Sequence, residues 1–141
     1  IDPETGVVTA DRYYVVDDFG NLINPVLAEG QVHGGVAQGL GQALTERVVY
    51  DEDGQLLTGS FADYLLPTST DLPDITAIAL EESPSEFNPM GFKGAGEGGI
   101  VAVAAAVGNA VTHALNAHNI QINDLPITPD RLRAALRAVG A

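Results

Sequence analysis

A single carboxylate, Glu97, stands in the most glycine-rich part of the chain, the stretch Lys93-Gly94-Ala95-Gly96-Glu97-Gly98-Gly99. Because glycines have no side chain, a large ligand can approach this backbone closely, and the loop can present Glu97 to a cleft. A carboxylate held in this way can act as a general base. An apolar run begins at Ile100, however, and an acidic residue just before a helix can simply stabilise the helix dipole. The local sequence leaves both roles open.

The same stretch contains a glycine pattern that occurs in nucleotide-binding proteins. Gly94, Gly96 and Gly99 have the G-x-G-x-x-G spacing of the dinucleotide fingerprint, and we expect a helix after them. The fingerprint also requires a strand directly before it, within a parallel βαβ unit. Residues 84–92 show no strand pattern, and Glu97 would place a negative charge near the pyrophosphate. We therefore do not expect a dinucleotide to bind through this pattern.

A second glycine-rich segment follows Asn24-Pro25. Its apolar residues recur at every fourth position, which predicts a long helix with one apolar side formed by Val32, Val36, Leu40, Leu44 and Val48. Each glycine inside a helix costs about 1 kcal/mol relative to alanine. The predicted helix nevertheless contains five of them, namely Gly30, Gly34, Gly35, Gly39 and Gly41. We expect this glycine face to pack closely against another element or a ligand.

Short strands are predicted on either side of this helix. Residues 7–16 are rich in β-branched and aromatic side chains and end in turn-forming residues at 17–21. Residues 75–80 alternate as a second strand would. Between them, two short apolar runs flank the acidic turn 51–54, and this pattern predicts a hairpin.

Two further helices are expected towards the C-terminus. An apolar run from about Ile100 to Leu115 predicts a buried helix, and Thr128-Pro129-Asp130 is a typical helix start. The closing helix should be amphipathic, with an apolar face formed by Leu132, Leu136 and Val139. Because strands and helices are interspersed without a regular βαβ order, we expect an α+β fold.

Composition restricts the possible partners. The chain has 19 acidic and 6 basic side chains, and its net charge of -13 would repel nucleic acid and anionic membranes. It has no cysteine, so it offers neither a disulfide nor a thiolate ligand. The spacing of His33, His113 and His118 fits no zinc signature, so we expect no side-chain metal ligands. Its longest apolar run is shorter than the roughly 20 residues that a bilayer crossing needs.

The length of the chain predicts one structural unit covering residues 1–141. Ile1 is not an initiator methionine, and Pro3-Glu4-Thr5-Gly6 reads as a turn with almost nothing before it to pair with Val7. We expect a split, processed or truncated polypeptide.

Two segments together resemble a known family. They are Gly30-Gln31-Val32-His33-Gly34-Gly35-Val36-Ala37-Gln38-Gly39-Leu40-Gly41 and Gly91-Phe92-Lys93-Gly94-Ala95-Gly96-Glu97, separated by a hairpin and Asp63-Tyr64-Leu65-Leu66-Pro67. In order and spacing they are similar to the C-terminal part of the molybdenum-binding large subunit of the xanthine oxidase, aldehyde oxidase and aerobic carbon monoxide dehydrogenase family. The nearest likeness is to bacterial members, from Ile1 to about Leu115. It implies the C-terminal portion of a molybdopterin-binding domain.

The resemblance implies roles for individual residues. Glu97 would stand next to molybdenum as the catalytic base, and Gln31 would contact the pterin through its amide. Gly96 and Ala95 would lie against the cofactor through backbone atoms. The family holds the metal through the dithiolene of the pterin, which again implies no side-chain ligands. Where animal members have prolines after the glutamate, this chain has Gly98-Gly99, a difference that affects the substrate pocket.

The implied activity is oxidative hydroxylation of an aldehyde, an N-heterocycle or a related small molecule, or oxidation of carbon monoxide, with water as the oxygen source. The implied cofactor is a molybdenum-pterin in its cytosine dinucleotide form, with iron-sulfur clusters and FAD on partner subunits or domains. The chain would need the remainder of the large subunit and would be inactive alone. We expect a cytoplasmic location, with a periplasmic one as the alternative. The alternative function is a non-catalytic fragment, or a cofactor-free paralogue, that completes a larger subunit.

Overall fold

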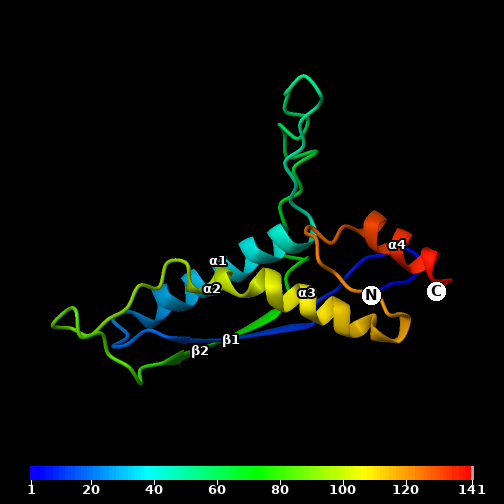
Figure 1. The fold of residues 1–141 in the computed structure, drawn as a ribbon. Helices are drawn as coiled ribbons and strands as arrows, with labels where there is room; N and C mark the ends of the chain where they lie inside the picture. The colour runs from blue at the N-terminus through cyan, green and yellow to red at the C-terminus, as the bar shows by residue number, and fades with distance from the viewer. Residues whose placement is uncertain (141) are drawn as a thin grey trace.

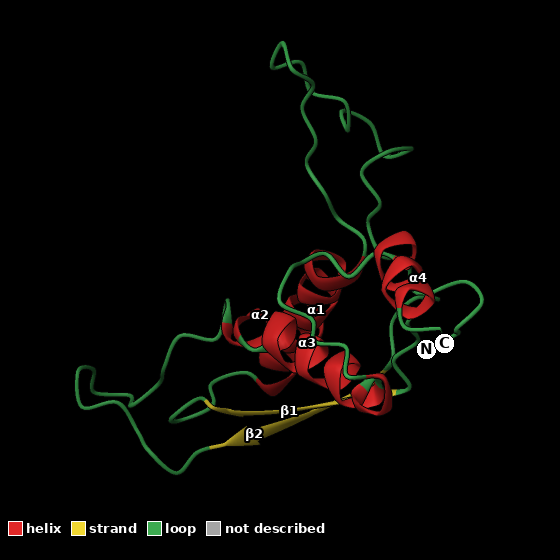
Figure 2. Ribbon diagram, turned by 45° about the vertical axis from the view of Figure 1, so that its right-hand side comes forward, coloured by secondary structure: helices red, strands yellow, loops and turns green. Residues whose placement is uncertain are grey.

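The computed structural model describes residues 1–140, so Ala141 of the predicted unit lies outside the described residues. The elements follow the order β1 (Arg12–Asp18), α1 (Pro25–Leu44), β2 (Asp74–Leu80), α2 (Gly98–Val101), α3 (Val103–Ala114), η1 (Asn116–His118) and α4 (Pro129–Ala138). Helices α1 and α3 lie on the same side of a two-stranded sheet (Figures 1 and 2). This combination confirms the predicted α+β class.

The two strands pair in parallel, with Arg12 opposite Asp74 and Asp18 opposite Leu80. Helix α1 connects them, so β1, α1 and β2 form one βαβ unit. The expectation that no such order exists is wrong at this point. The pattern is not recognisable in the sequence because a long connection, residues 45–73, separates α1 from β2.

Strand β1 is shifted from its predicted range of residues 7–16. It begins at Arg12, where β2 offers its first partner, and continues through Asp17 and Asp18. These two acids were expected in the turn. The turn instead follows them, and the Asp18 carboxylate accepts a hydrogen bond from the Gly20 N–H at 2.8 Å. Gly20 has a φ of +63°, which favours glycine.

Helix α1 begins as predicted after Asn24, whose side chain accepts a hydrogen bond from the Leu27 N–H. Its apolar side is buried at Val32, Val36 and Leu40. The predicted stripe ends early, because Val48 lies beyond the helix and is exposed. This side of α1 forms the centre of the core.

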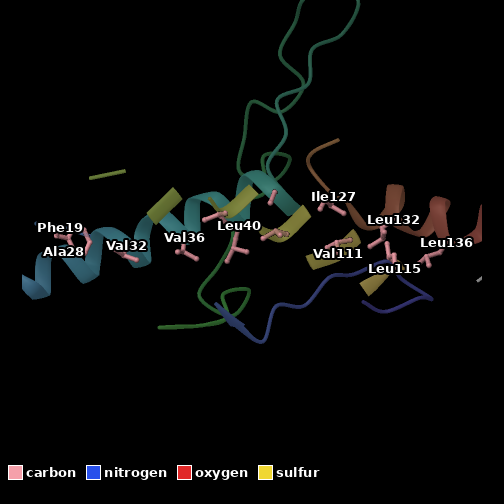
Figure 3. Packing of buried hydrophobic residues seen from close by; sticks show 13 residues of the cluster. Phe19, Ala28, Val32, Val36, Leu40, Val111, Leu115, Ile127, Leu132 and Leu136 are labelled. Atoms are coloured by element: carbon pink, nitrogen blue, oxygen red, sulfur yellow. The ribbon is translucent and has the colours of Figure 1, made fainter. Parts of the chain in front are cut away.

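The remaining core comes from the C-terminal helices (Figure 3). From α3 onwards the buried residues are Val103, Val107, Val111, Leu115, Ile127, Leu132 and Leu136. The apolar run predicted as one buried helix is divided at Ala102 into α2 and α3, and only one side of α3 is buried. Helix α4 starts at Pro129 as predicted, but Val139 is exposed rather than part of its apolar face.

Residues 46–66 leave the body at the C-terminal end of α1 as a projecting arm (Figures 1 and 2). The predicted hairpin lies in this arm. Tyr50 and Leu56 form an antiparallel bridge, and the Asp51 N–H donates to the Gln55 carbonyl at 3.0 Å. The pairing is too short to count as two strands.

Candidate functional site

Glu97 lies directly before α2, and its side chain is exposed. Its carboxylate makes no capping hydrogen bond to the α2 backbone. Helix α2 is only four residues long, so the dipole that a nearby acid could stabilise is small. The Glu97 carboxylate thus makes no capping hydrogen bond and lies beside only a short helix, so it is available to other groups.

A surface depression of about 390 Å³ brings Glu97 together with the glycine face of α1. Both segments that the sequence singled out contribute to it. Its lining consists of Gly30, Gln31, Gly34, Gly35, Gln38, Gly96, Glu97 and Ile100. Bare backbone, two side-chain amides and one carboxylate thus face the same space.

Close backbone contact between α1 and α2 produces this arrangement. A Cβ atom added to Gly99 would lie 2.5 Å from the Val32 carbonyl oxygen, and one added to Gly35 would lie 2.8 Å from the Ile100 nitrogen. Both distances are too short for a real side chain. The glycines at these positions therefore allow the backbone after Glu97 to rest directly on α1.

The loop that leads to Glu97 is anchored at the other side by the end of β1. The Lys93 N–H donates to the Phe19 carbonyl at 2.8 Å, and the Lys93 ammonium lies 3.4 Å from the Asp18 carboxylate. The hydrogen bond from Gly20 N–H and the nearby Lys93 charge lower the pKa of Asp18. The loop is thus held at Lys93 by β1 and after Glu97 by α1.

Other glycines of the depression have no packing role within the chain. A Cβ added to Gly30, Gly34 or Gly96 would meet nothing within 4 Å. Open glycines are expected where a ligand approaches the backbone. The exposed Gln31 and Gln38 amides can both donate and accept hydrogen bonds, which suits the polar edge of a pterin. The residues present therefore fit such a group.

Three of the four predicted site residues, Glu97, Gln31 and Gly96, meet in the depression. Ala95 does not line it. It is half-buried, packs against the core, and lines a neighbouring hollow together with Lys93 and Gln31. This hollow and the depression have only Gln31 in common among their lining residues. The backbone contact of Ala95 with the cofactor therefore stays a prediction.

Gln38 is a lining residue that the sequence analysis did not single out. It follows Gln31 by seven residues, which is close to two helical turns, so both amides lie on one face of α1. This spacing was visible in the sequence. In the sequence, the apolar stripe and the glycines dominate this segment, so the second amide does not stand out.

Two other sequence patterns have no matching structure. Residues 83–97 contain no strand, and Phe92 forms only an isolated bridge with Gly20, so the dinucleotide fingerprint lacks its preceding strand.

Within residues 1–140, no three His, Cys, Asp or Glu side chains cluster as metal ligands would. His33 lies one turn from Glu29, with Nε2 4.0 Å from the carboxylate. No helix in this described part combines the length and apolarity needed to span a bilayer.

The sequence model of the molybdopterin cofactor-binding domain matches residues 1–73, which is more than half of the chain. The chain belongs to this family. Gln31 lies inside the matched region. Among curated relatives, the nicotine 6-hydroxylase large subunit of Paenarthrobacter nicotinovorans is 42% identical over 139 residues, covering 99% of this chain and 17% of the relative. The carbon monoxide dehydrogenase large chain of Afipia carboxidovorans is 41% identical over 129 residues, covering 86% of this chain and 15% of the relative.

Solved structures of this molybdopterin family share the fold. Quinoline 2-oxidoreductase from Pseudomonas putida 86 superposes with a TM-score of 0.92 and 43% identity, over 97% of this chain and 17% of that one. Aldehyde oxidoreductase from Desulfovibrio gigas gives a TM-score of 0.83 and 29% identity over 97% of this chain and 14% of that one. These matches confirm the resemblance to a molybdenum-binding large subunit. The chain spans about one sixth of the length of the curated relatives.

Proposed function

We propose that this chain forms one wall of the molybdenum-pterin site of a hydroxylase, with Glu97 as the catalytic base. The observation that carries the proposal is the shared depression, in which Glu97 faces the Gln31 amide and the bare backbone of Gly96. The substrate is an aldehyde, an N-heterocycle or a related small molecule, or carbon monoxide. Water is the source of oxygen.

Each lining residue has a task in this proposal. The Gln31 amide binds the pterin, and the backbone of Gly96 and Ala95 lies against the cofactor. Glu97 accepts the proton of the oxygen that is transferred to the substrate. The cofactor, when bound, accepts the two electrons that the substrate loses. Because Glu97 is hydrogen-bonded neither to α2 nor to the packed core, its carboxylate can face the bound substrate.

The wider assembly is part of the proposal. We expect the cofactor in its cytosine dinucleotide form, and iron-sulfur clusters and FAD on partner subunits or domains. One relative, which is 40% identical to this chain over 132 residues, is named as the gamma subunit of the 6-hydroxypseudooxynicotine dehydrogenase complex. The remainder of the large subunit completes the site, and the complex is cytoplasmic, with the periplasm as the alternative location.

The test uses the complete enzyme with Glu97→Gln, which keeps the shape of the side chain and removes the base. Turnover should fall by roughly 10²- to 10⁴-fold while molybdenum and pterin content stays normal. Glu29→Gln is the matched control, because Glu29 is an exposed acid on α1 that does not line the depression. Equal turnover of both variants would contradict the proposal. The non-catalytic alternative predicts that equality, and it leaves the open depression without a use.

A further inference from the structure

The projecting arm, residues 46–66, has no part in the proposed site, yet it carries an unusual share of exposed apolar side chains. Seven of the 21 large apolar side chains that are exposed in the described chain lie on it, although it comprises 21 of 141 residues. They are Val48, Tyr50, Leu56, Leu57, Phe61, Leu65 and Leu66. An apolar surface of this kind usually marks an interaction site.

The outer part of the arm is braced by its own hydrogen bonds. The Asp51 carboxylate accepts from the N–H groups of Asp53 and Gln55, at 3.0 and 2.8 Å. The Leu57 N–H donates to the Val49 carbonyl at 2.8 Å, and the Val49 N–H donates to the Thr58 hydroxyl oxygen at 3.0 Å. These hydrogen bonds within the arm give its outer part a defined shape.

The base of the arm is fixed to the end of α1. The Thr45 hydroxyl donates to the Leu65 carbonyl at 2.7 Å, and the Tyr64 hydroxyl donates to the Glu46 carboxylate. The Glu46 side chain and Pro67 fill the space beside Gly41, where a Cβ would not fit. Because shape and base are set in advance, docking of the arm costs little conformational entropy.

Charge and chain length indicate what the arm contacts. The arm has five acidic residues against one basic residue, Arg47, so its partner surface should be an apolar groove with a basic rim. A second copy of this chain, with a net charge of -13, would add like charges to the contact. About five sixths of the length of the curated relatives lies outside the matched segment, in the same polypeptide. An apolar contact suits such a permanent neighbour.

We propose that the arm docks into a basic-rimmed apolar groove on the remaining part of the same large-subunit polypeptide, and so fixes the end of α1 to it. This proposal rests on membership of the family and not on the role of Glu97. Loss of the arm contact and loss of base catalysis are therefore separate results.

A photo-crosslinker identifies the occupant in the complete enzyme. Phe61→p-benzoylphenylalanine places it at the most exposed apolar side chain of the arm. After irradiation, the main product should keep the mass of one large subunit on a denaturing gel. Its crosslinked peptide should come from outside the 141-residue segment. A crosslink to a second large subunit, to another kind of subunit or to this segment itself would overturn the proposal, as would recovery of only uncrosslinked enzyme.

A second measurement uses limited proteolysis of the arm in the same enzyme. Leu57→Asp and Phe61→Asp should increase cleavage roughly 10- to 100-fold, because each places a charge in an apolar contact. Gln55→Asp adds the same charge at an exposed polar position of the arm and should leave cleavage unchanged. Equal cleavage in all three variants would show that the arm lies in solvent and would refute docking.

Discussion

The residues around Glu97 leave space rather than fill it. Gly30, Gly34 and Gly96 expose bare backbone to the depression, and nothing in the described chain lies where their side chains would be. Gln31 and Gln38 add two amides on one helix face. A carboxylate, two amides and open peptide groups suit a planar polar ligand better than they suit a packed protein contact.

The two amides provide a test of cofactor binding. Gln31→Leu and Gln38→Leu should each weaken retention of the pterin, because each removes a hydrogen bond worth about 1 kcal/mol, or roughly fivefold in affinity. Gln42→Leu is the matched control, since Gln42 is exposed on the same helix and does not line the depression. Pterin and molybdenum content of the purified enzyme is the measurement. Equal pterin and molybdenum content in all three variants would show that the two amides do not bind the cofactor.

Single residues of the site were predictable to different degrees. The glycine-rich sequence drew attention to the loop around Glu97 and left its role open, whereas the roles of Glu97, Gly96 and Gln31 in the site came from resemblance to the family. Only the structure adds Gln38, because its place depends on the contact between α1 and α2. The structure also shows that the Ala95 side chain packs against the core.

Some glycines of helix α1 are closely packed against other parts of the chain and others are open, and this difference distinguishes the packed face of the helix from the face that lines the depression. Gly35 and Gly39 lie under α2 and Val103, where an added Cβ would come within 2.9 Å of other atoms. Gly34 is open to the depression. One helix therefore supports the backbone beside Glu97 and also forms the floor of the site.

Adjacent alanine substitutions separate these two functions of α1. In the cofactor-free subunit, Gly35→Ala should lower stability by about 1 to 3 kcal/mol, because the methyl group overpacks against the α2 backbone. Gly34→Ala should raise it by about 0.5 to 1 kcal/mol, because an open helical position favours alanine. Thermal unfolding measures both. A stability gain from Gly35→Ala would show that α1 and α2 are not in close backbone contact.

The elements themselves were predicted best where local pattern dominates. The start of α1 at Asn24-Pro25, the apolar stripe to Leu40 and the alternation of β2 are all local signals. The parallel pairing was missed because it joins residues about sixty positions apart across the arm. The start of β1 depends on its partner strand in the same way, and no local pattern records that partner.

The molecule as a whole has several surfaces that another part of the subunit is expected to cover. Tyr14, Val16 and Ile78 are exposed on the sheet face away from the helices, whereas parallel sheets are usually covered on both faces. The depression around Glu97 is likewise open on one side. Both features agree with a chain that supplies one part of a larger subunit.

This incompleteness predicts the behaviour of the isolated chain. Residues 1–141 alone should not retain a stoichiometric amount of molybdopterin through gel filtration, because only one wall of the site is present. Mixing with the remainder of the subunit should restore retention. Stoichiometric pterin on the isolated chain would mean that this segment holds the cofactor without help.

The central claim, that Glu97 is the base, is tested most directly by rapid mixing of substrate with the complete Glu97→Gln enzyme. Base catalysis by Glu97 predicts that reduction of molybdenum by the substrate slows by roughly 10²- to 10⁴-fold, while later electron transfer to the flavin and the metal content match Glu29→Gln. A helix-capping role predicts only a stability loss of about 0.3 to 1 kcal/mol. A molybdenum-replete Glu97→Gln enzyme that is reduced at the rate of the Glu29→Gln control would contradict the assignment of Glu97 as the base.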